Sequence, residues 1–252
     1  MTTAFFAPPS AVHGRRLVLP PGEARHATRA LRHTQGDEIW VVDGEGRRHR
    51  VRLEQTGEEK TVGTILDTQN EAGEPPYQLA LGLGLLKRRA RYETFLEKAV
   101  ELGATRLVPL RTRHAERDTL RADRAERLLR AALKQSGRSR LPRLDAPTPF
   151  PEALRGPEGT PPGHTLLAHR RPAADPSLTE ALAGVSPGRR LRVLVGPEGG
   201  FSSDEVEAAE EAGATIVSLG PRRLRAETAA LAAAAAVMLA LGDGSESQRD
   251  LI

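Results

Sequence analysis

The sequence contains no cysteine, and its lysines are confined to Lys60, Lys87, Lys98 and Lys134. The absence of cysteine excludes disulfides, thiolate nucleophiles and cysteine-bound zinc. Nearly all positive charge therefore comes from arginine, whose planar guanidinium suits phosphate and base recognition but also surface ion pairs. A genomic bias toward arginine codons explains the same composition, so the arginine content alone identifies no ligand.

Long apolar runs are also missing. The longest, Ala229 to Leu241, is too short to cross a bilayer, which needs roughly 20 residues. The first residues, Met1 to Pro9, lack the basic start and sustained apolar stretch of a signal peptide. We therefore expect a cytoplasmic protein without a membrane partner. Its 252 residues suffice for one large domain or two smaller ones.

The N-terminal part, up to about residue 70, has short strands separated by tight turns. Asp43-Gly44-Glu45-Gly46 is a strong hairpin signal. The predicted elements are extended runs at 16–19, 38–42, 47–53 and 60–66, with one helix at 23–33. Short strands, tight turns and one helix predict a small β-barrel.

Arginines concentrate on the hairpin and helix of this barrel. Arg47, Arg48 and Arg50 lie on one predicted strand, with Arg25, Arg29 and Arg32 on the helix. They suit a face that binds RNA phosphates. Charged residues also protect exposed strand edges from aggregation, and the two interpretations have about equal weight. We predict no metal site, because the histidines lack ligand spacing.

A polar stretch with glycine and two prolines, residues 67–78, has the composition of a linker. We place the domain boundary there. The predicted division is a barrel domain at 1–70, a linker at 71–78 and a second domain at 79–252.

Beyond residue 79, strands alternate with helices, which predicts a largely parallel α/β sheet. The expected strands are 79–85, 105–110, 164–168, 191–195 and 215–219, and the expected helices end near residues 102, 136, 183 and 241. Leu79 to Leu85 has only alanine or glycine between its leucines, so a helix or backbone segment should approach closely. The proline-rich residues 142–162 are expected to loop over the surface.

A glycine turn, Gly196-Pro-Glu-Gly-Gly200, follows the strand at 191–195. It matches neither the Rossmann fingerprint nor the phosphate-binding loop. Glu198 would repel a polyphosphate, so a ligand with hydroxyls or positive charge fits better. Ser202 and Glu205 have the spacing of a helix capping box. A second loop, Leu219 to Thr228, follows the next strand, so the two loops should frame one crevice.

These two loops resemble the signature of the RsmE-type 16S ribosomal RNA uridine-N3 methyltransferases, which belong to the trefoil-knotted SPOUT superfamily. The resemblance extends to Lys87–Glu93, Glu97–Gly103, Gln135-Ser136 and the N-terminal part, which fits that family's PUA-like barrel. It therefore covers nearly the whole chain. Arg223 departs from it by standing where an aliphatic residue is usual, and Lys134 stands where an acidic residue is common.

The resemblance implies a deeply knotted C-terminal domain that binds S-adenosylmethionine and no metal. It also implies a homodimer whose substrate is 16S ribosomal RNA or the small ribosomal subunit, with the helix from Glu227 as an interface element. The residues expected to bind the cofactor are Leu166, Leu167, Ala168, His169, Val195, Gly196, Pro197, Glu198, Gly199, Gly200, Leu219, Gly220, Leu224, Arg225, Glu227 and Thr228.

The chemistry requires loss of the proton on uridine N3, because the protonated imide nitrogen is a poor nucleophile. Glu198 or Glu227 is the expected base, and Arg225 is expected to stabilise charge on the uracil carbonyl oxygens. Glu227 would equally stabilise a helix N-terminus. Arg88, Arg89, Arg113 and Arg138 are further candidates for RNA phosphate contacts, although those near 138 would also stabilise a helix C-terminus.

Two other functions remain open from the sequence. A non-catalytic RNA-binding protein would share the basic barrel, but it gives no reason for two glycine loops at one crevice. A knotted methyltransferase acting on ribose 2′-hydroxyls would share the whole fold and differ only in the atom that it methylates.

Overall fold

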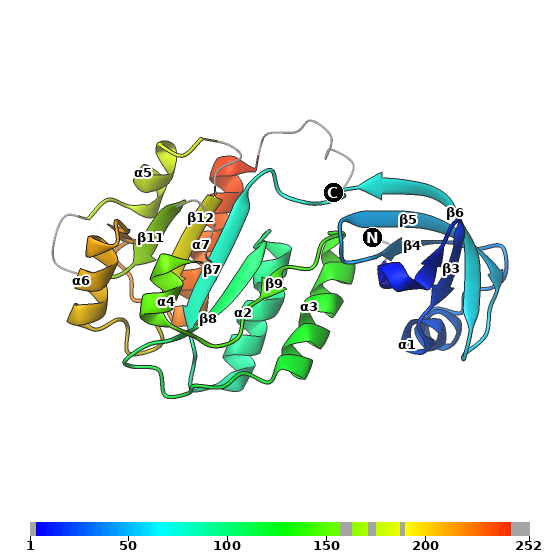
Figure 1. Ribbon diagram of the computed structural model, residues 1–252, viewed down its shortest axis with the longest axis horizontal. Coiled ribbons are helices and arrows are strands. Elements are labelled where there is room, and N and C mark those ends of the chain that lie inside the picture. Colours follow the sequence, from blue (N-terminus) through cyan, green and yellow to red (C-terminus); the bar gives the residue numbers. More distant parts are fainter. Residues whose placement is uncertain (1–3, 157–162, 171–174, 187–189, 243–252) are drawn as a thin grey trace. The chain divides into compact units, whose positions relative to one another are not determined.

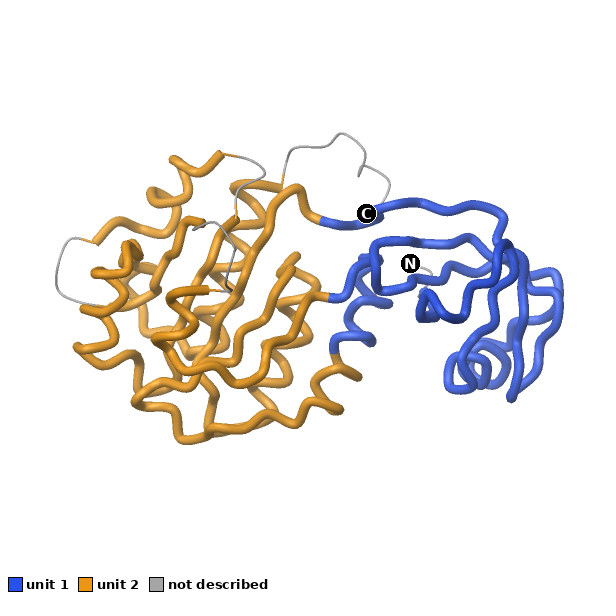
Figure 2. Tube along the Cα trace, in the orientation of Figure 1, with its two compact units in different colours: residues 1–74, 129–141 blue, residues 75–128, 142–252 orange. Residues whose placement is uncertain are grey.

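The computed structural model describes residues 4–156, 163–170, 175–186 and 190–242 (Figure 1). The chain forms two compact units (Figure 2). The N-terminal unit comprises Met1–Glu74 and Leu129–Leu141, and the C-terminal unit comprises Pro75–Leu128 and Pro142–Ile252. The division at 1–70, 71–78 and 79–252 stays a prediction, and it did not anticipate that Leu129–Leu141 packs with the N-terminal residues.

The N-terminal unit is built on a six-stranded sheet with the order β1-β4-β5-β6-β3-β2. Among the described strand pairs of this sheet, β1–β4 is parallel and the others are antiparallel. The strands are β1 (Phe5–Phe6), β2 (Val12–His13), β3 (Arg16–Leu19), β4 (Glu38–Val42), β5 (Arg47–Gln55) and β6 (Thr61–Asn70). Inward-facing residues such as Leu17, Ile39 and Val51 are almost completely buried, and they form its core.

The predicted strands of this unit are present, but two predicted bounds were wrong. Strand β6 continues to Asn70, so residues 67–70 belong to the sheet although their composition resembles a linker. A 3₁₀ turn, η1 (Pro9–Ala11), precedes β2. The helical segment, which follows β3, consists of α1 (Pro21–Arg25) and a π turn, η2 (His26–Ala30). It ends before His33 because Arg32 has a left-handed φ of 57°.

The C-terminal unit contains a parallel sheet of seven strands in its described part, with the order β10-β8-β7-β12-β11-β13 and β9 paired to β8. Because all these pairs are parallel, the carboxyl ends of the strands lie at one edge. The strands are β7 (Gln78–Gly84), β8 (Arg106–Arg111), β9 (Arg143–Leu144), β10 (Thr148–Pro149), β11 (His164–Ala168), β12 (Arg190–Val195) and β13 (Thr215–Val217).

Helices cover both faces of this sheet (Figure 1). On one face α4 (Phe150–Arg155) and α6 (Ser203–Glu211) share a core with β8, β11, β12 and β13. On the other, α7 (Ala226–Leu241) contacts β7, β12, α2 (Arg89–Glu101) and α5 (Leu178–Ala183). The remaining helix, α3 (Ala122–Ser136), continues from the C-terminal unit into the N-terminal unit.

The expectation that residues 142–162 form only a surface loop was wrong. That stretch contains β9, β10 and α4, and Phe150 of α4 is 1% exposed because it packs against Phe201. Its prolines misled the prediction: one precedes α4 and another lies in its first turn, where a missing N–H is tolerated. Residues 157–162 of the stretch lie outside the described residues.

Candidate active site

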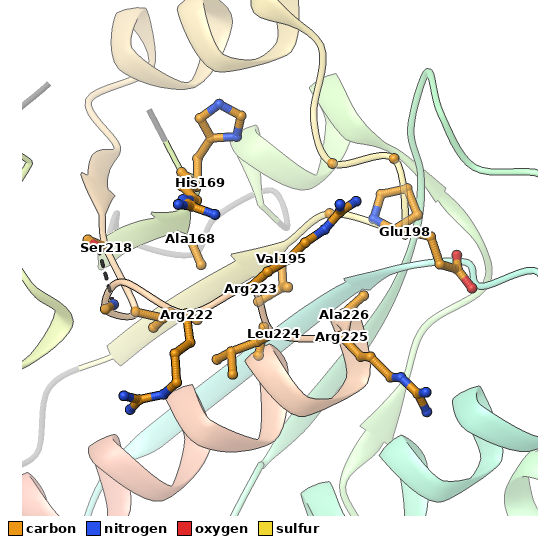
Figure 3. Close-up of a pocket in the computed structure, with 18 of the residues that line it drawn as sticks. Ala168, His169, Val195, Glu198, Ser218, Arg222, Arg223, Leu224, Arg225 and Ala226 are labelled. Atoms are coloured by element: carbon orange, nitrogen blue, oxygen red, sulfur yellow. Dashed lines mark hydrogen bonds between the residues drawn. The ribbon is translucent and has the colours of Figure 1, made fainter. Parts of the chain in front are cut away.

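A cavity of about 640 Å³ lies at the edge where the parallel strands end. Its walls are the segments that follow β11, β12 and β13 and the start of α7 (Figure 3). Arg91 of α2 also lines the cavity. A cavity of this size can hold a cofactor or a drug-sized ligand. The prediction that the two glycine loops frame one crevice is therefore confirmed.

Close packing explains the glycines of the first loop. A Cβ on Gly84 would lie 2.4 Å from the backbone nitrogen of Pro197, and one on Gly196 would lie 2.8 Å from the carbonyl carbon of Gly200. Gly200 itself has a φ of 73° and donates its N–H to Pro197 O at 2.9 Å. Leucine–glycine alternation in β7 thus lets the loop backbone lie directly against the sheet, as predicted.

The capping box predicted at Ser202 is present. Glu205 N–H donates to Ser202 Oγ at 3.3 Å, and Ser202 N–H donates to Glu205 Oε2 at 2.9 Å. Glu205 Oε1 also accepts the N–H of Arg113 at 2.8 Å, so the segment after β8 is attached to the start of α6. These bonds fix the exit of the glycine loop.

The second loop turns at Gly220, which has a φ of 96° and donates its N–H to Ser218 Oγ at 3.2 Å. Leu178 N–H donates to Ser218 O at 3.0 Å, which fixes the loop start to α5. Arg225 then occupies the N-cap position of α7. Figure 3 shows the Arg222 and Arg225 side chains extending away from each other on either side of Leu224.

Most residues predicted to bind the cofactor line this cavity. They are Ala168, His169, Val195, Gly196, Pro197, Glu198, Gly199, Gly200, Leu219, Gly220, Leu224 and Arg225. The other four are not among its lining residues. Leu166 and Leu167 are buried within β11, and Glu227 and Thr228 belong to the first turn of α7. Their contacts to a cofactor stay predictions.

Glu198 is exposed at the cavity, and its Oε2 accepts the N–H of Lys87 at 3.4 Å. Its side chain points away from the end of the cavity formed by Ala168 and His169 (Figure 3). The Lys87 ammonium pairs with Glu116 at 2.8 Å, and this hydrogen-bonded partner raises the pKa of Lys87. Lys87 therefore contacts Glu198 through its backbone while its charged end is engaged elsewhere.

Arg91 is a cavity residue that the sequence did not single out for a role. Its Nε lies 3.6 Å from Glu227 Oε1, and the two side chains are 26% and 12% exposed. Glu227 Oε2 is buried and has no hydrogen-bond partner among the described residues. One feature of the sequence could have identified Arg91: it is a basic residue in the first turn of the helix that follows β7. The other lining residues missed are Arg170, Ser218, Arg222, Arg223, Ala226 and Ala229.

The arginines predicted to contact RNA differ in their surroundings. In the C-terminal unit, Arg88, Arg89 and Arg113 are exposed. In the N-terminal unit, Arg25, Arg32 and Arg47 are exposed, Arg29 pairs with Glu58, and Arg50 pairs with Glu38. Arg48 is half-buried, because its guanidinium lies 4.5 Å above the Trp40 ring and bonds Gln69.

Arg138 is not presented to solvent. It is 3% exposed, and its Nη2 donates to Glu74 Oε2 at 2.7 Å. The N–H groups of Ser139 and Arg140 donate to the other oxygen of Glu74 at 2.9 and 2.8 Å. Arg138 thus fastens two segments of the N-terminal unit, and this burial argues against its predicted phosphate contact. Lys134 likewise bonds Glu23 at 2.6 Å.

Among the described residues, no group of three or more histidine, aspartate or glutamate side chains is arranged to hold a metal ion. None of the helices in the described ranges is both long and apolar enough to span a membrane.

Both units match families of known proteins. Residues 73–238 match the family described as RNA methyltransferase domain, and residues 19–66 match the RNA methyltransferase PUA domain. The fold prediction of a PUA-like barrel with an α/β domain is therefore confirmed.

Individual relatives match along most of their length. Ribosomal RNA small subunit methyltransferase E of Synechocystis is 32% identical, over 88% of this chain and 72% of that protein. The Mycobacterium bovis protein of the same name is 31% identical, over 89% and 86%. A crystal structure of methyltransferase E from Neisseria gonorrhoeae bound to S-adenosylmethionine is 29% identical, with a TM-score of 0.83 over 97% of this chain and 100% of that one.

Proposed function

The chain belongs to the ribosomal RNA small subunit methyltransferase E family, and from this premise we propose that it transfers a methyl group from S-adenosylmethionine to N3 of a uridine in 16S ribosomal RNA. The observation that carries the proposal is the single cavity framed by the loops after β11, β12 and β13. The substrate would be met in the cytoplasm, where ribosomal subunits assemble.

The cavity suits S-adenosylmethionine in size and chemistry. Ala168, Val195 and Leu224 offer apolar surface to an adenine ring, while the loop backbones offer hydrogen-bonding groups. Glu198 disfavours a polyphosphate but tolerates a sulfonium or ribose hydroxyls. When bound, the cofactor supplies an activated methyl group. The N. gonorrhoeae relative was crystallised with this cofactor, which supports the same ligand here.

The residues of the chain would then orient the uridine and help to remove its N3 proton. We propose Glu198 as the base, because its exposed carboxylate lines the cavity and points away from the Ala168 end. Arg225, also a lining residue, is the proposed contact for a uracil carbonyl oxygen. Alignment of donor and acceptor supplies the remainder of the rate enhancement.

Transfer of a tritiated methyl group tests this function. Small ribosomal subunits purified from cells that lack the gene are incubated with labelled S-adenosylmethionine and the protein. We expect label in 16S ribosomal RNA, and none with subunits from cells that have the gene. Intact RNA binding without any transfer would instead favour a non-catalytic RNA-binding protein.

We also propose that the N-terminal unit contributes to RNA binding. It matches the PUA domain of RNA methyltransferases, and Arg25, Arg32 and Arg47 are exposed on it. The pairs of Arg29 and Arg50 with glutamates are exposed, so they stabilise the fold little and can exchange for phosphate contacts. In the C-terminal unit we retain Arg88, Arg89 and Arg113 as candidates.

A homodimer is the proposed assembly, with α7 at the interface. Leu239 of α7 is 71% exposed, so this helix presents a large apolar side chain to solvent on the side away from its buried residues. Sedimentation equilibrium should give twice the chain mass. Replacing Leu239 with glutamate should shift the mass toward that of the monomer, and an unchanged monomer mass for the original chain would refute the dimer.

A trefoil knot is the proposed topology of the C-terminal unit. The last helix, α7, packs against the central strands β7 and β12 and against α2, as expected if the chain end passes through a loop. Because the chain lacks cysteine, two introduced cysteines can carry handles for single-molecule stretching. A knotted chain should remain shorter than its full extended length, and full extension would refute the knot.

A further inference from the structure

Arg91 is held at the cavity by a carboxylate from another helix. It lies in the first turn of α2, and Glu227 lies in the first turn of α7. The Arg91 Nε to Glu227 Oε1 distance of 3.6 Å is short enough for an ion pair but longer than a hydrogen bond. Both side chains are mostly buried, so solvent screens this pair less than it screens a surface pair.

The location of Arg91 opposes local electrostatic preference. The first turn of a helix has partial positive charge, which disfavours a cation, and the first turn of α2 contains no acidic residue. Glu227, in contrast, suits the first turn of α7 and can offset the charge of Arg91. A residue that is electrostatically unfavourable for its helix position and that lines a cavity, as Arg91 does, is typical of a functional site.

The charge of Arg91 fits the acceptor base better than the reacting end of the cofactor. The sulfonium is positive, so a neighbouring guanidinium would repel it. The uracil imide instead becomes negative when N3 loses its proton, and this charge is shared with the carbonyl oxygens. A partly buried, fixed guanidinium stabilises such charge more strongly than a solvated one.

We propose that Arg91 is a catalytic residue that donates to a uracil carbonyl oxygen, and that Glu227 is the positioning residue that holds it. This inference rests on the proposed function. The N3–H bond breaks and its proton passes to the Glu198 carboxylate, while Arg91 stabilises the charge on the carbonyl oxygen. The N3 electron pair then forms a bond to the methyl carbon, and the carbon–sulfur bond breaks to leave a neutral thioether.

Arg91 would thereby supply a second, partly buried cation beside the exposed Arg225. It also explains why the Glu227 carboxylate is buried beside the cavity without lining it. Glu227 would act through Arg91, so removal of either residue should impair the same step.

The test compares Arg91→Gln, Glu227→Gln and their combination in single-turnover methyl transfer to small subunits. We expect Arg91→Gln to lower the transfer rate at neutral pH about 100- to 1,000-fold, as removal of one oxyanion donor does. The dissociation constant of S-adenosylmethionine should change less than about twofold. The combined variant should lose little more than Arg91→Gln alone, because coupled residues are not additive.

A readout specific to charge stabilisation is the response to pH and to the acidity of the substrate. The deficit of Arg91→Gln should shrink about tenfold or more at alkaline pH, and in subunits whose RNA contains 5-fluorouridine, which has a more acidic N3. Arg124→Gln is the matched control. It breaks a pair between Arg124 of α3 and Glu93 of α2, neither of which lines the cavity, and should leave the rate unchanged.

Two outcomes would overturn the inference. A deficit that is the same at every pH and with 5-fluorouridine would make Arg91 structural only. A dissociation constant for S-adenosylmethionine that rises as much as the rate falls would assign Arg91 to the cofactor. Failure of the unsubstituted protein to methylate any uridine would refute the proposed function itself, which distinguishes the two failures.

Discussion

The backbone N–H of Lys87 donates to Glu198 Oε2 at 3.4 Å, and this bond joins the segment after β7 to the glycine loop after β12. The two residues are 111 positions apart in the sequence, so the parallel sheet brings them together. Glu198 therefore has two separable properties, a hydrogen bond that holds the loop and a negative charge that can accept a proton.

Replacement of Glu198 separates these properties. In Glu198→Gln the amide oxygen can still accept the Lys87 N–H, so the affinity for S-adenosylmethionine should stay within about threefold. The transfer rate should fall at least about 100-fold, because general bases contribute 10²–10⁴. Glu198→Ala should in addition weaken cofactor binding about fivefold, since a hydrogen bond is worth about 1 kcal/mol. Near-native turnover of Glu198→Gln would exclude this residue as the base.

Substitution of Gly84 tests the close approach of the glycine loop to β7. A Cβ there would lie 2.4 Å from the nitrogen of Pro197, so Gly84→Ala should displace the loop and cost about 1–3 kcal/mol of unfolding free energy. Cofactor affinity should fall with it. Gly184→Ala is the control, because nothing lies within 4 Å of its added Cβ. Urea denaturation measures the unfolding free energy and calorimetric titration measures the cofactor affinity. Equal effects of the two variants would contradict the packing argument.

The sequence predicted the cavity well because its walls are local motifs. Each glycine loop follows directly on a strand, and Ser202 and Glu205 are three residues apart, so their bonds need no long-range information. Parallel strand order then brings the loops to one edge. Arg91 escaped notice because its partner, Glu227, is distant in the sequence and is reached only through packing of α2 against α7.

The same limit applies elsewhere. Nothing in the sequence indicated that Arg138, a predicted RNA contact, is buried against Glu74, because the two residues are 64 positions apart and only the fold brings them together. Helix α4 was not predicted because its prolines are typical of loops, although proline is also common at the start of a helix. The predicted strand stopped at residue 66 because no strand period is visible in the polar stretch that follows, although pairing with β5 extends β6 to Asn70.

The Glu74–Arg138 pair should be important for stability rather than for RNA binding. The two side chains are 7% and 4% exposed, so Glu74→Gln removes the negative charge that lies against the buried Arg138 guanidinium and should cost about 3–5 kcal/mol of unfolding free energy. Glu71→Gln is the matched control, since its pair with Arg140 is exposed and should cost less than about 1 kcal/mol. Urea unfolding followed by circular dichroism measures both. Comparable losses would mean that burial does not distinguish the pairs.

Salt dependence of RNA binding tests the arginines of β5. A triple variant in which Arg47, Arg48 and Arg50 are all changed to alanine should have a shallower slope of log affinity against log salt concentration. The slope should change by about 0.9 per lost duplex phosphate contact, or about 0.7 per lost single-strand contact. Arg155→Ala, which removes an exposed arginine of α4, should leave the slope unchanged. An unaltered slope and affinity in the triple variant would remove β5 from the RNA footprint.

The central claim is that the methyl group goes to N3 of a uridine, and mass spectrometry of digested 16S ribosomal RNA tests it most directly. Small subunits from cells without the gene are treated with the protein and S-adenosylmethionine carrying a deuterated methyl group, and the labelled nucleoside is fragmented. The account predicts a single labelled uridine whose deuterated methyl stays with the base and is assigned to N3 against a synthetic standard. Label on the ribose, on another base or on another ring atom would contradict it.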